Sequence, residues 1–145
     1  MFVDRIEPRP GWSDMVAVRL LRRWVAIRAE GTPALPDLVA FGGGLGASAQ
    51  VVVALASLFQ LVEAALGRAL AAECCCRVEL GPDERAVLLL LASVPAAPAP
   101  GTSLAIPHGL PGALVWAVLS VRRLLEMDGG AADLVCGRCP FRAAD

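Results

Sequence analysis

The sequence predicts an all-α protein, a small bundle of about four principal helices with a Gly-rich loop and a Pro-rich connector. Apolar residues recur at helical spacing in several long Ala/Leu/Val-rich segments. Clusters of glycine and proline separate those segments, and only short stretches alternate as a strand would. The chain has 145 residues, the size of one domain, so we expect a single helical domain over residues 1–145.

The N-terminal region predicts an extended arm followed by the first helix. Residues 1–11 are polar and hold two prolines, so we expect them to be extended. Ser13 is a suitable N-cap for a helix over residues 14–30, and Gly31 suits its end. The side chains expected to face the core are Ala17, Leu20, Leu21, Trp24 and Ile27. Those expected on or near the solvated side are Arg19, Arg22, Arg23 and Glu30.

The next segment is predicted to interrupt the helical pattern. Residues 37–41 favour a short turn or strand, and residues 42–46 (Gly-Gly-Gly-Leu-Gly) favour a flexible loop. Together with Ala47, these glycines match the Gly-x-Gly-x-x-Ala spacing of a dinucleotide-binding loop. That fold needs further alternating strands and helices, which this sequence does not supply. A flexible connection between helices is therefore favoured over a nucleotide site.

Two further helices are predicted in the middle of the chain. Ser48 is suited to cap a helix over residues 49–72, because apolar residues recur there at helical spacing. A helix over residues 82–94 begins with Pro82 and two acidic residues, as helix N-termini favour. It is apolar nearly all round, so we expect it to be the central and most buried element.

The last helix is predicted over residues 111–127. It follows a stiff, extended Pro-rich connector over residues 95–101. Val115 is expected to face inward and Trp116 to lie in the core. A glycine pair at 129–130 is expected to end the helix, leaving a Cys-containing tail over residues 128–145.

Composition excludes several classes of function. The net charge is -1, which argues against nucleic acid or an anionic membrane as a partner and favours a solvated arginine face. All the basic side chains are arginines, so no lysine can bind phosphate or form a Schiff base. His108 is the only histidine, and no nucleophile motif accompanies it, so we expect no enzymatic site. The apolar runs are too short, or too interrupted by charges, for a membrane span. We expect a cytoplasmic protein with reduced thiols.

The five cysteines are the residues best suited to a specific chemistry. Cys74, Cys75 and Cys76 are consecutive, and Cys136 and Cys139 form a Cys-x-x-Cys pair. Structural zinc takes four ligands, and Cys74, Cys76, Cys136 and Cys139 could supply them. A thiol redox pair is a further alternative, ranked below zinc because the thioredoxin-type context is missing. Free cysteine also packs as a small hydrophobe, and this interpretation is favoured over zinc.

The middle of the chain resembles an uncharacterised family of small alphaproteobacterial proteins of the sphingomonad kind. The pattern is a Phe-Gly loop at Phe41, a long Ala/Leu helix, the triple cysteine, and an acidic start at Asp83 to an apolar helix. The resemblance covers about residues 38–91 and does not include Cys136 and Cys139. Because the family is a domain of unknown function, the resemblance implies no activity, substrate or ligand.

The sequence therefore predicts a small non-enzymatic, cytosolic helical protein that acts as a scaffold or a protein-interaction module. A protein partner or a homodimer is the expected assembly. The alternative is a zinc-binding or thiol-based regulatory protein that uses Cys74, Cys76, Cys136 and Cys139.

Overall fold

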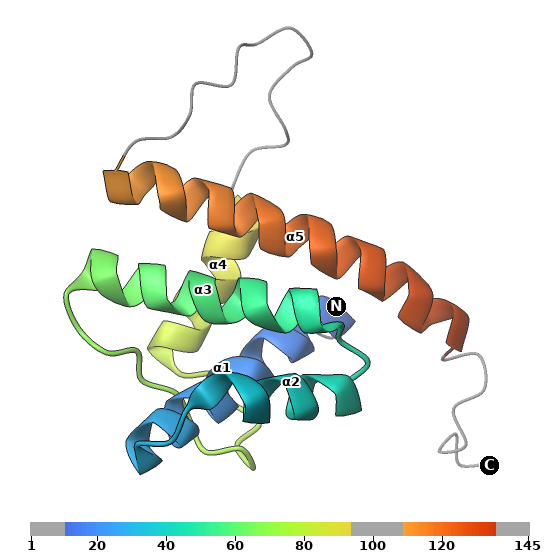
Figure 1. Cartoon of the computed structure of the whole chain (residues 1–145), viewed down its shortest axis with the longest axis horizontal. Coiled ribbons are helices and arrows are strands. Elements are labelled where there is room, and N and C mark those ends of the chain that lie inside the picture. The colour runs from blue at the N-terminus through green and yellow to red at the C-terminus, as the bar shows by residue number, and fades with distance from the viewer. Residues whose placement is uncertain (1–10, 94–108, 136–145) are drawn as a thin grey trace, which may run out of the picture.

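The computed structural model describes residues 11–93 and 109–135, and these fold into five α-helices (Figure 1). The helices are α1 (Trp12–Glu30), α2 (Ala34–Gly44), α3 (Ala49–Leu66), α4 (Pro82–Ser93) and α5 (Gly109–Val135). No strand occurs within the two described ranges. The predicted all-α class is confirmed, with one helix more than the expected four. The expected arm and connector lie outside the described residues, apart from Gly11.

α1 is the central element of this arrangement, since it contacts all four other helices. α3 and α5 lie alongside one another and share the most extensive helix–helix contact (Figure 1). The helix expected to be central, α4, contacts α1 and α5, and its Leu89 side chain is 69% exposed. The expectation that α4 is the central and most buried element was therefore wrong, because only one face of this helix meets the bundle.

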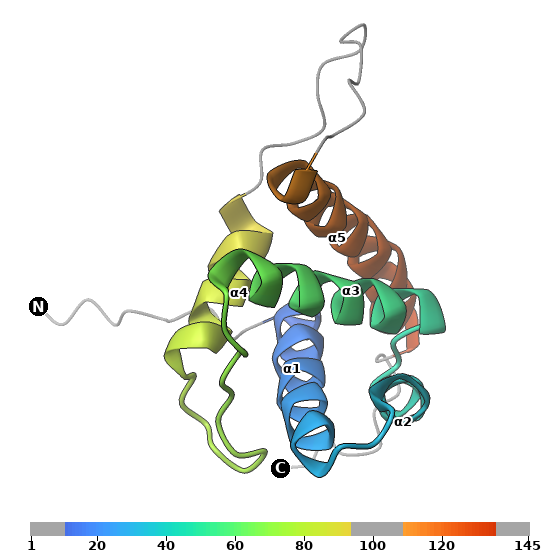
Figure 2. The ribbon, with the colours of Figure 1, turned by 60° about the vertical axis from the view of Figure 1, so that its left-hand side comes forward.

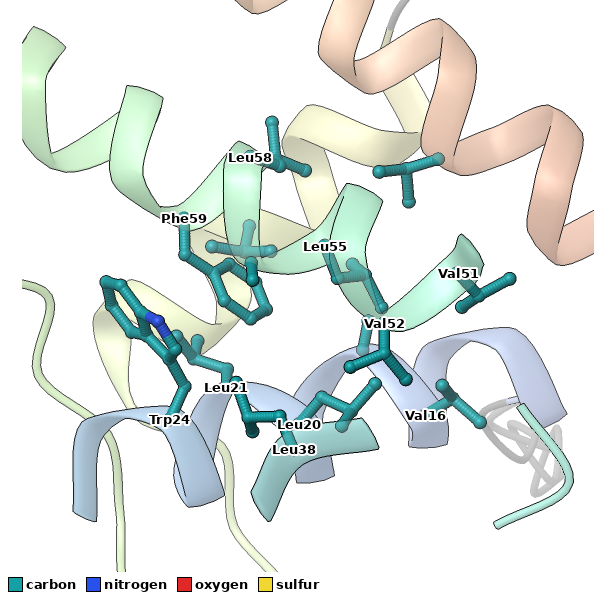
Figure 3. Packing of buried hydrophobic residues seen from close by; sticks show 14 of the residues in the cluster. Val16, Leu20, Leu21, Trp24, Leu38, Val51, Val52, Leu55, Leu58 and Phe59 are labelled. Carbon is teal, nitrogen blue, oxygen red and sulfur yellow. The ribbon is translucent and has the colours of Figure 1, made fainter. Parts of the chain in front are cut away.

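The core lies mainly between α1, α2 and α3 (Figure 3). Trp24 of α1 packs against Phe59 of α3 with a ring-centroid distance of 5.4 Å. The buried neighbours shown with them are Val16, Leu20, Leu21, Leu38, Val51, Val52, Leu55 and Leu58. All five core residues predicted on α1 are buried. Burying such large apolar side chains stabilises the fold by about 1.5–3 kcal/mol each.

Backbone and side-chain caps define the helix ends. Gly31 has φ 75° and ends α1 as predicted, whereas α1 begins after Gly11, without a side-chain cap from Ser13. The Ser48 hydroxyl accepts a hydrogen bond from Val51 N–H at 3.3 Å, so its predicted role as N-cap of α3 is confirmed. α3 ends at Leu66 rather than residue 72, because Gly67 adopts φ 68° and turns the chain away.

Most of the glycine-rich segment is helical, which corrects the expected turn or strand followed by a loop. Residues 37–44 belong to α2, and of the predicted loop over residues 42–46 only Leu45 and Gly46 form a turn. A Cβ atom added to Gly42 would lie 2.4 Å from Cγ2 of Val52, so glycine here permits the close approach of α2 and α3. With no strand before it, the segment lacks the strand–loop–helix order of a dinucleotide site.

α5 continues through the predicted stop at residues 129–130 and ends at Val135. A Cβ atom added to Gly129 would lie 3.5 Å from Cε3 of the Trp12 indole, an ordinary van der Waals distance, so this glycine lies against Trp12 within the helix. Trp116, expected in the core, is 43% exposed, and Val115 is also exposed. The buried residues of this helix include Val118 and Val121 instead.

One helix in the described part of the chain, α3, is long and apolar enough to cross a membrane by length and composition alone. Its mean hydropathy is 1.8, and 33% of its residues are buried inside the bundle. A single helix of this kind is a weak indication, because the core helix of a soluble protein meets the same criteria.

Candidate functional site

The candidate site is the segment that joins α3 to α4, residues 67–81, which we call the cysteine loop. Figure 2 shows it leaving α3 and returning to α4 on the opposite side of α1 from α2. Cys74, Cys75 and Cys76 are all exposed in this loop. The favoured interpretation of the triple cysteine as buried packing was therefore wrong. In this loop the residues that are buried are Leu70 and Gly81.

A buried ion pair between α1 and α4 anchors the loop. Arg22 Nε lies 2.7 Å from Glu84 Oε1, and Arg22 Nη2 lies 3.1 Å from Glu84 Oε2. The Glu84 side chain is fully buried, and that of Arg22 is 9% exposed. The expected position of Arg22 on the solvated side of its helix was wrong, since the cysteine loop covers it.

The same two side chains hold the loop backbone on both sides of the cysteines. Glu84 accepts hydrogen bonds from the N–H groups of Glu73 at 3.0 Å and Gly81 at 2.8 Å. Arg22 donates to the carbonyl oxygens of Arg77 at 2.7 Å and Glu79 at 3.1 Å. Burial alone would raise the pKa of Glu84, but the hydrogen bonds from Arg22, Gly81 and Glu73 outweigh it and lower that pKa.

A second ion pair holds the start of the loop. Arg68 makes two hydrogen bonds of 2.8 Å to the carboxylate of Asp83, which also accepts one of 2.8 Å from Ala71 N–H. The hydrogen bonds from Arg68 and Ala71 lower the pKa of Asp83 to about 2. Asp83 and Glu84 were predicted only as acidic residues of a helix start. They also stabilise the preceding loop by accepting hydrogen bonds from its backbone.

A third carboxylate, Glu63, acts at the end of α3. It accepts a hydrogen bond of 2.8 Å from Leu70 N–H and pairs with Arg28, whose guanidinium lies 4.4 Å from the centre of the Trp24 ring. An open hollow of about 300 Å³ lies here, lined by Val25, Arg28, Ala29, Glu63, Ala69 and Leu70. The two charged side chains in its lining pair with each other, so both hold the end of α3 and the start of the loop in place.

The cysteines themselves form a tight turn. Arg77 N–H donates to Cys74 C=O at 3.0 Å, and the sulfur atoms of Cys74 and Cys76 lie 3.1 Å apart. The backbone N–H and the thiol of Cys76, together with the thiol of Cys75, lower the pKa of Cys74. The hydrogen bond with the Cys74 sulfur, and the negative charge of that sulfur when it is a thiolate, raise the pKa of Cys76. The two thiols are thus unequal, and Cys74 more readily forms the thiolate, which is the nucleophilic form.

The predicted zinc ligands are only partly placed. Cys74 and Cys76 are brought together, whereas Cys136 and Cys139 lie outside the described residues, so the four-cysteine site stays a prediction. Among the residues that the structure describes, no group of three or more His, Cys, Asp or Glu side chains is arranged to hold a metal ion. His108 is also outside the described part.

No family model, no curated protein and no solved structure matches this chain. The resemblance to a sphingomonad-type family stays a prediction. The fold and the loop together define a helical bundle that presents a thiol pair on an anchored surface segment. Any assignment of function therefore depends on the geometry of that loop.

Proposed function

We propose that this protein is a thiol-based regulatory protein, in which reversible oxidation of Cys74 and Cys76 to a disulfide changes its state. The observation that carries the proposal is the 3.1 Å separation of the two sulfur atoms in an exposed turn. A disulfide bond requires about 2.05 Å between sulfurs, so a small movement of the two side chains suffices.

The properties of the two thiols support this function. Reactive cysteines are accessible and have a lowered pKa, and Cys74 has both properties. An exposed disulfide is generally more easily reduced than a buried structural one, which suits a regulatory role. The expected reducing cytoplasm would keep the pair as thiols until an oxidant appears.

The proposal can be tested in a full-length chain carrying Cys136→Ser and Cys139→Ser, which leaves the cysteines of the loop. Mild treatment with hydrogen peroxide should remove two titratable thiols per chain, lower the mass by two hydrogens, and be reversed by dithiothreitol. Cys75→Ser should preserve this reaction, whereas Cys74→Ser or Cys76→Ser should abolish it. A Cys75→Ser chain that keeps both remaining thiols under peroxide would contradict the proposal.

The four-cysteine zinc site is distinguished by metal analysis of the unmodified chain. One zinc ion per chain, lost in the Cys74→Ser and the Cys139→Ser variants, would contradict the redox proposal and support a metal-dependent function. Zinc-free protein with freely reactive thiols would favour the disulfide.

A second candidate is the protein-interaction module that the sequence predicts. Val78, two residues after Cys76, is 92% exposed, and an apolar side chain so close to the thiols suits contact with another protein. For the case in which the partner is a second copy of the chain, light scattering measures the molar mass of the reduced and the oxidised protein. A monomer mass in both states would count against self-association, and Val78→Ser provides the matched variant if a dimer forms.

A further inference from the structure

We infer that Arg22 is the positioning residue for this thiol pair, because it holds the backbone of the cysteine loop in the turn that keeps the two sulfurs adjacent. The inference rests on the proposed function and adds a residue from another helix to it. Arg22 is remote in sequence from the cysteines. The fold brings it to the loop, because α1 packs beside this segment.

The chemistry that Arg22 would support has two steps with a hydroperoxide as oxidant. The Cys74 thiolate attacks one peroxide oxygen, the O–O bond breaks, and the leaving hydroxide or alkoxide takes a proton from solvent. Cys74 is then a sulfenic acid. The Cys76 thiol attacks its sulfur, the S–S bond forms, the S–O bond breaks, and water leaves with the thiol proton. Two thiols are oxidised and one hydroperoxide is reduced.

The second step depends on backbone geometry, since both cysteines lie on the same turn. Glu84, fixed by Arg22, holds Glu73 immediately before that turn and Gly81 after it. Arg22 itself holds Arg77 and Glu79 on the far side of the cysteines. Because the two flanks are held by one buried ion pair, these hydrogen bonds limit the conformations open to the turn between them.

The turn that Arg22 holds also favours the required form of Cys74. The groups that lower the pKa of Cys74 are the backbone N–H and the thiol of Cys76 and the thiol of Cys75, and all of them lie in this turn. Arg22 therefore acts on Cys74 through the backbone of the loop, without being the nucleophile or the resolving thiol.

Other arginines provide matched controls. Arg23, the next residue on α1, makes two hydrogen bonds of 2.8 Å to Asp37, away from the cysteine loop. Arg68 donates to the carbonyl oxygen of Ala69 and pairs with Asp83, so it holds the start of the loop rather than the turn. Arg23→Lys therefore shows the effect of losing a two-bond arginine–carboxylate pair away from the loop. Arg68→Lys shows the effect of loosening the loop at its start.

The experiment measures the rate of Cys74–Cys76 disulfide formation against pH in the Cys136→Ser, Cys139→Ser chain, with thiolate followed by its ultraviolet absorbance. Arg22→Lys keeps a positive charge for Glu84 but cannot make the fork and both carbonyl contacts. An Arg22→Leu, Glu84→Leu double variant removes both charges, and replacing a buried pair by apolar residues often preserves the fold.

We expect disulfide formation to slow about tenfold in both Arg22 variants, since the turn regains conformational freedom. In the double variant, where neither side chain holds the turn, the pH midpoint of the rate should also rise toward that of an ordinary thiol, because the groups of Cys75 and Cys76 that lower the pKa of Cys74 are then less well placed. Arg23→Lys should leave rate and midpoint unchanged, and Arg68→Lys should change them less than Arg22→Lys does.

Three outcomes would overturn the inference. Unchanged rates in folded Arg22 variants would show that Arg22 does not position the thiols. Equal slowing in Arg68→Lys would mean that general loosening of the loop explains the effect, and unfolding of both Arg22 variants would make Arg22 a structural residue. Failure of the parent chain to form the disulfide would instead contradict the proposed function.

Discussion

The core and the cysteine loop are both built on α1, but different forces hold them. On one side of this helix, Trp24 packs into an apolar core against α3. On another side, Arg22 holds a loop of irregular backbone both directly and through the buried carboxylate of Glu84. An irregular loop has backbone groups that no helix satisfies, so it needs directional hydrogen bonds where the core needs only apolar contact. The comparison indicates that disrupting the core should unfold the bundle, whereas disrupting the ion pair should chiefly release the loop.

The largest effect is expected from Trp24→Ala in the core. It removes the contact with Phe59 and the stacking of Arg28, and it leaves a cavity at a site that is 2% exposed. We expect a loss of about 3–5 kcal/mol in the free energy of unfolding, measured by urea denaturation with circular dichroism. Trp116→Ala, at a half-exposed position on α5, is the matched control and should cost clearly less. Equal losses would contradict the assignment of the core.

Glu84→Ala should have the next largest effect. Removing this carboxylate leaves Arg22 buried without its partner and frees the N–H groups of Glu73 and Gly81. We expect a loss of about 3 kcal/mol in stability, and faster hydrogen exchange confined mainly to residues 73–81. Glu79→Ala is the control, because the structure uses only the backbone carbonyl of Glu79 as a hydrogen-bond acceptor for Arg22. Uniform faster exchange across all helices would contradict a separate role for the loop.

The apolar half of this comparison could be predicted from the sequence, because it depends on local periodicity. The spacing of Leu20, Leu21 and Trp24 indicates a buried helical face, and the structure confirms it. The glycines misled the prediction in two places. Gly42 and Gly129 both lie within helices and against a neighbouring element, and such tertiary contacts, which can outweigh helix propensity, leave no local pattern.

The polar half could be predicted only in part. The cysteines were recognised as the residues most suited to chemistry, but their exposure was not foreseen. The partners of Arg22 are Glu84 and carbonyl groups more than 50 residues away, so helical periodicity alone assigned Arg22 to the solvated face. The signal that was present is the pair Asp83 and Glu84 at a helix start. Two acids directly after a loop can accept hydrogen bonds from that loop as well as from their own helix.

Acid should weaken the Arg68–Asp83 anchor of the loop. The pKa of Asp83 is lowered from 3.8 to about 2 in the folded chain, so this contribution to stability is fully present above pH 4. It is lost as the pH falls from about 4 toward about 2, because the unfolded chain then binds a proton that the folded chain does not. The loss at the acid end is about 2 kcal/mol at most.

Asp83→Asn provides the control for this pH dependence. The amide cannot ionise, so the difference in stability between the parent chain and this variant should shrink as the pH falls through that window. Urea denaturation at several pH values measures both chains. A difference that stays constant down to pH 2 would contradict the assigned lowering of the Asp83 pKa.

The smallest effect is expected from Arg23→Ala, although Arg23 neighbours Arg22 and also makes two hydrogen bonds to a carboxylate. The side chains of Arg23 and Asp37 are both exposed, so water and salt weaken their attraction and replace it when it is lost. We expect a change in unfolding free energy close to the error of the measurement, and no change in the disulfide rate. A loss as large as that of Glu84→Ala would mean that pairing alone, rather than burial and contact with loop backbone, gives the Arg22–Glu84 pair its importance.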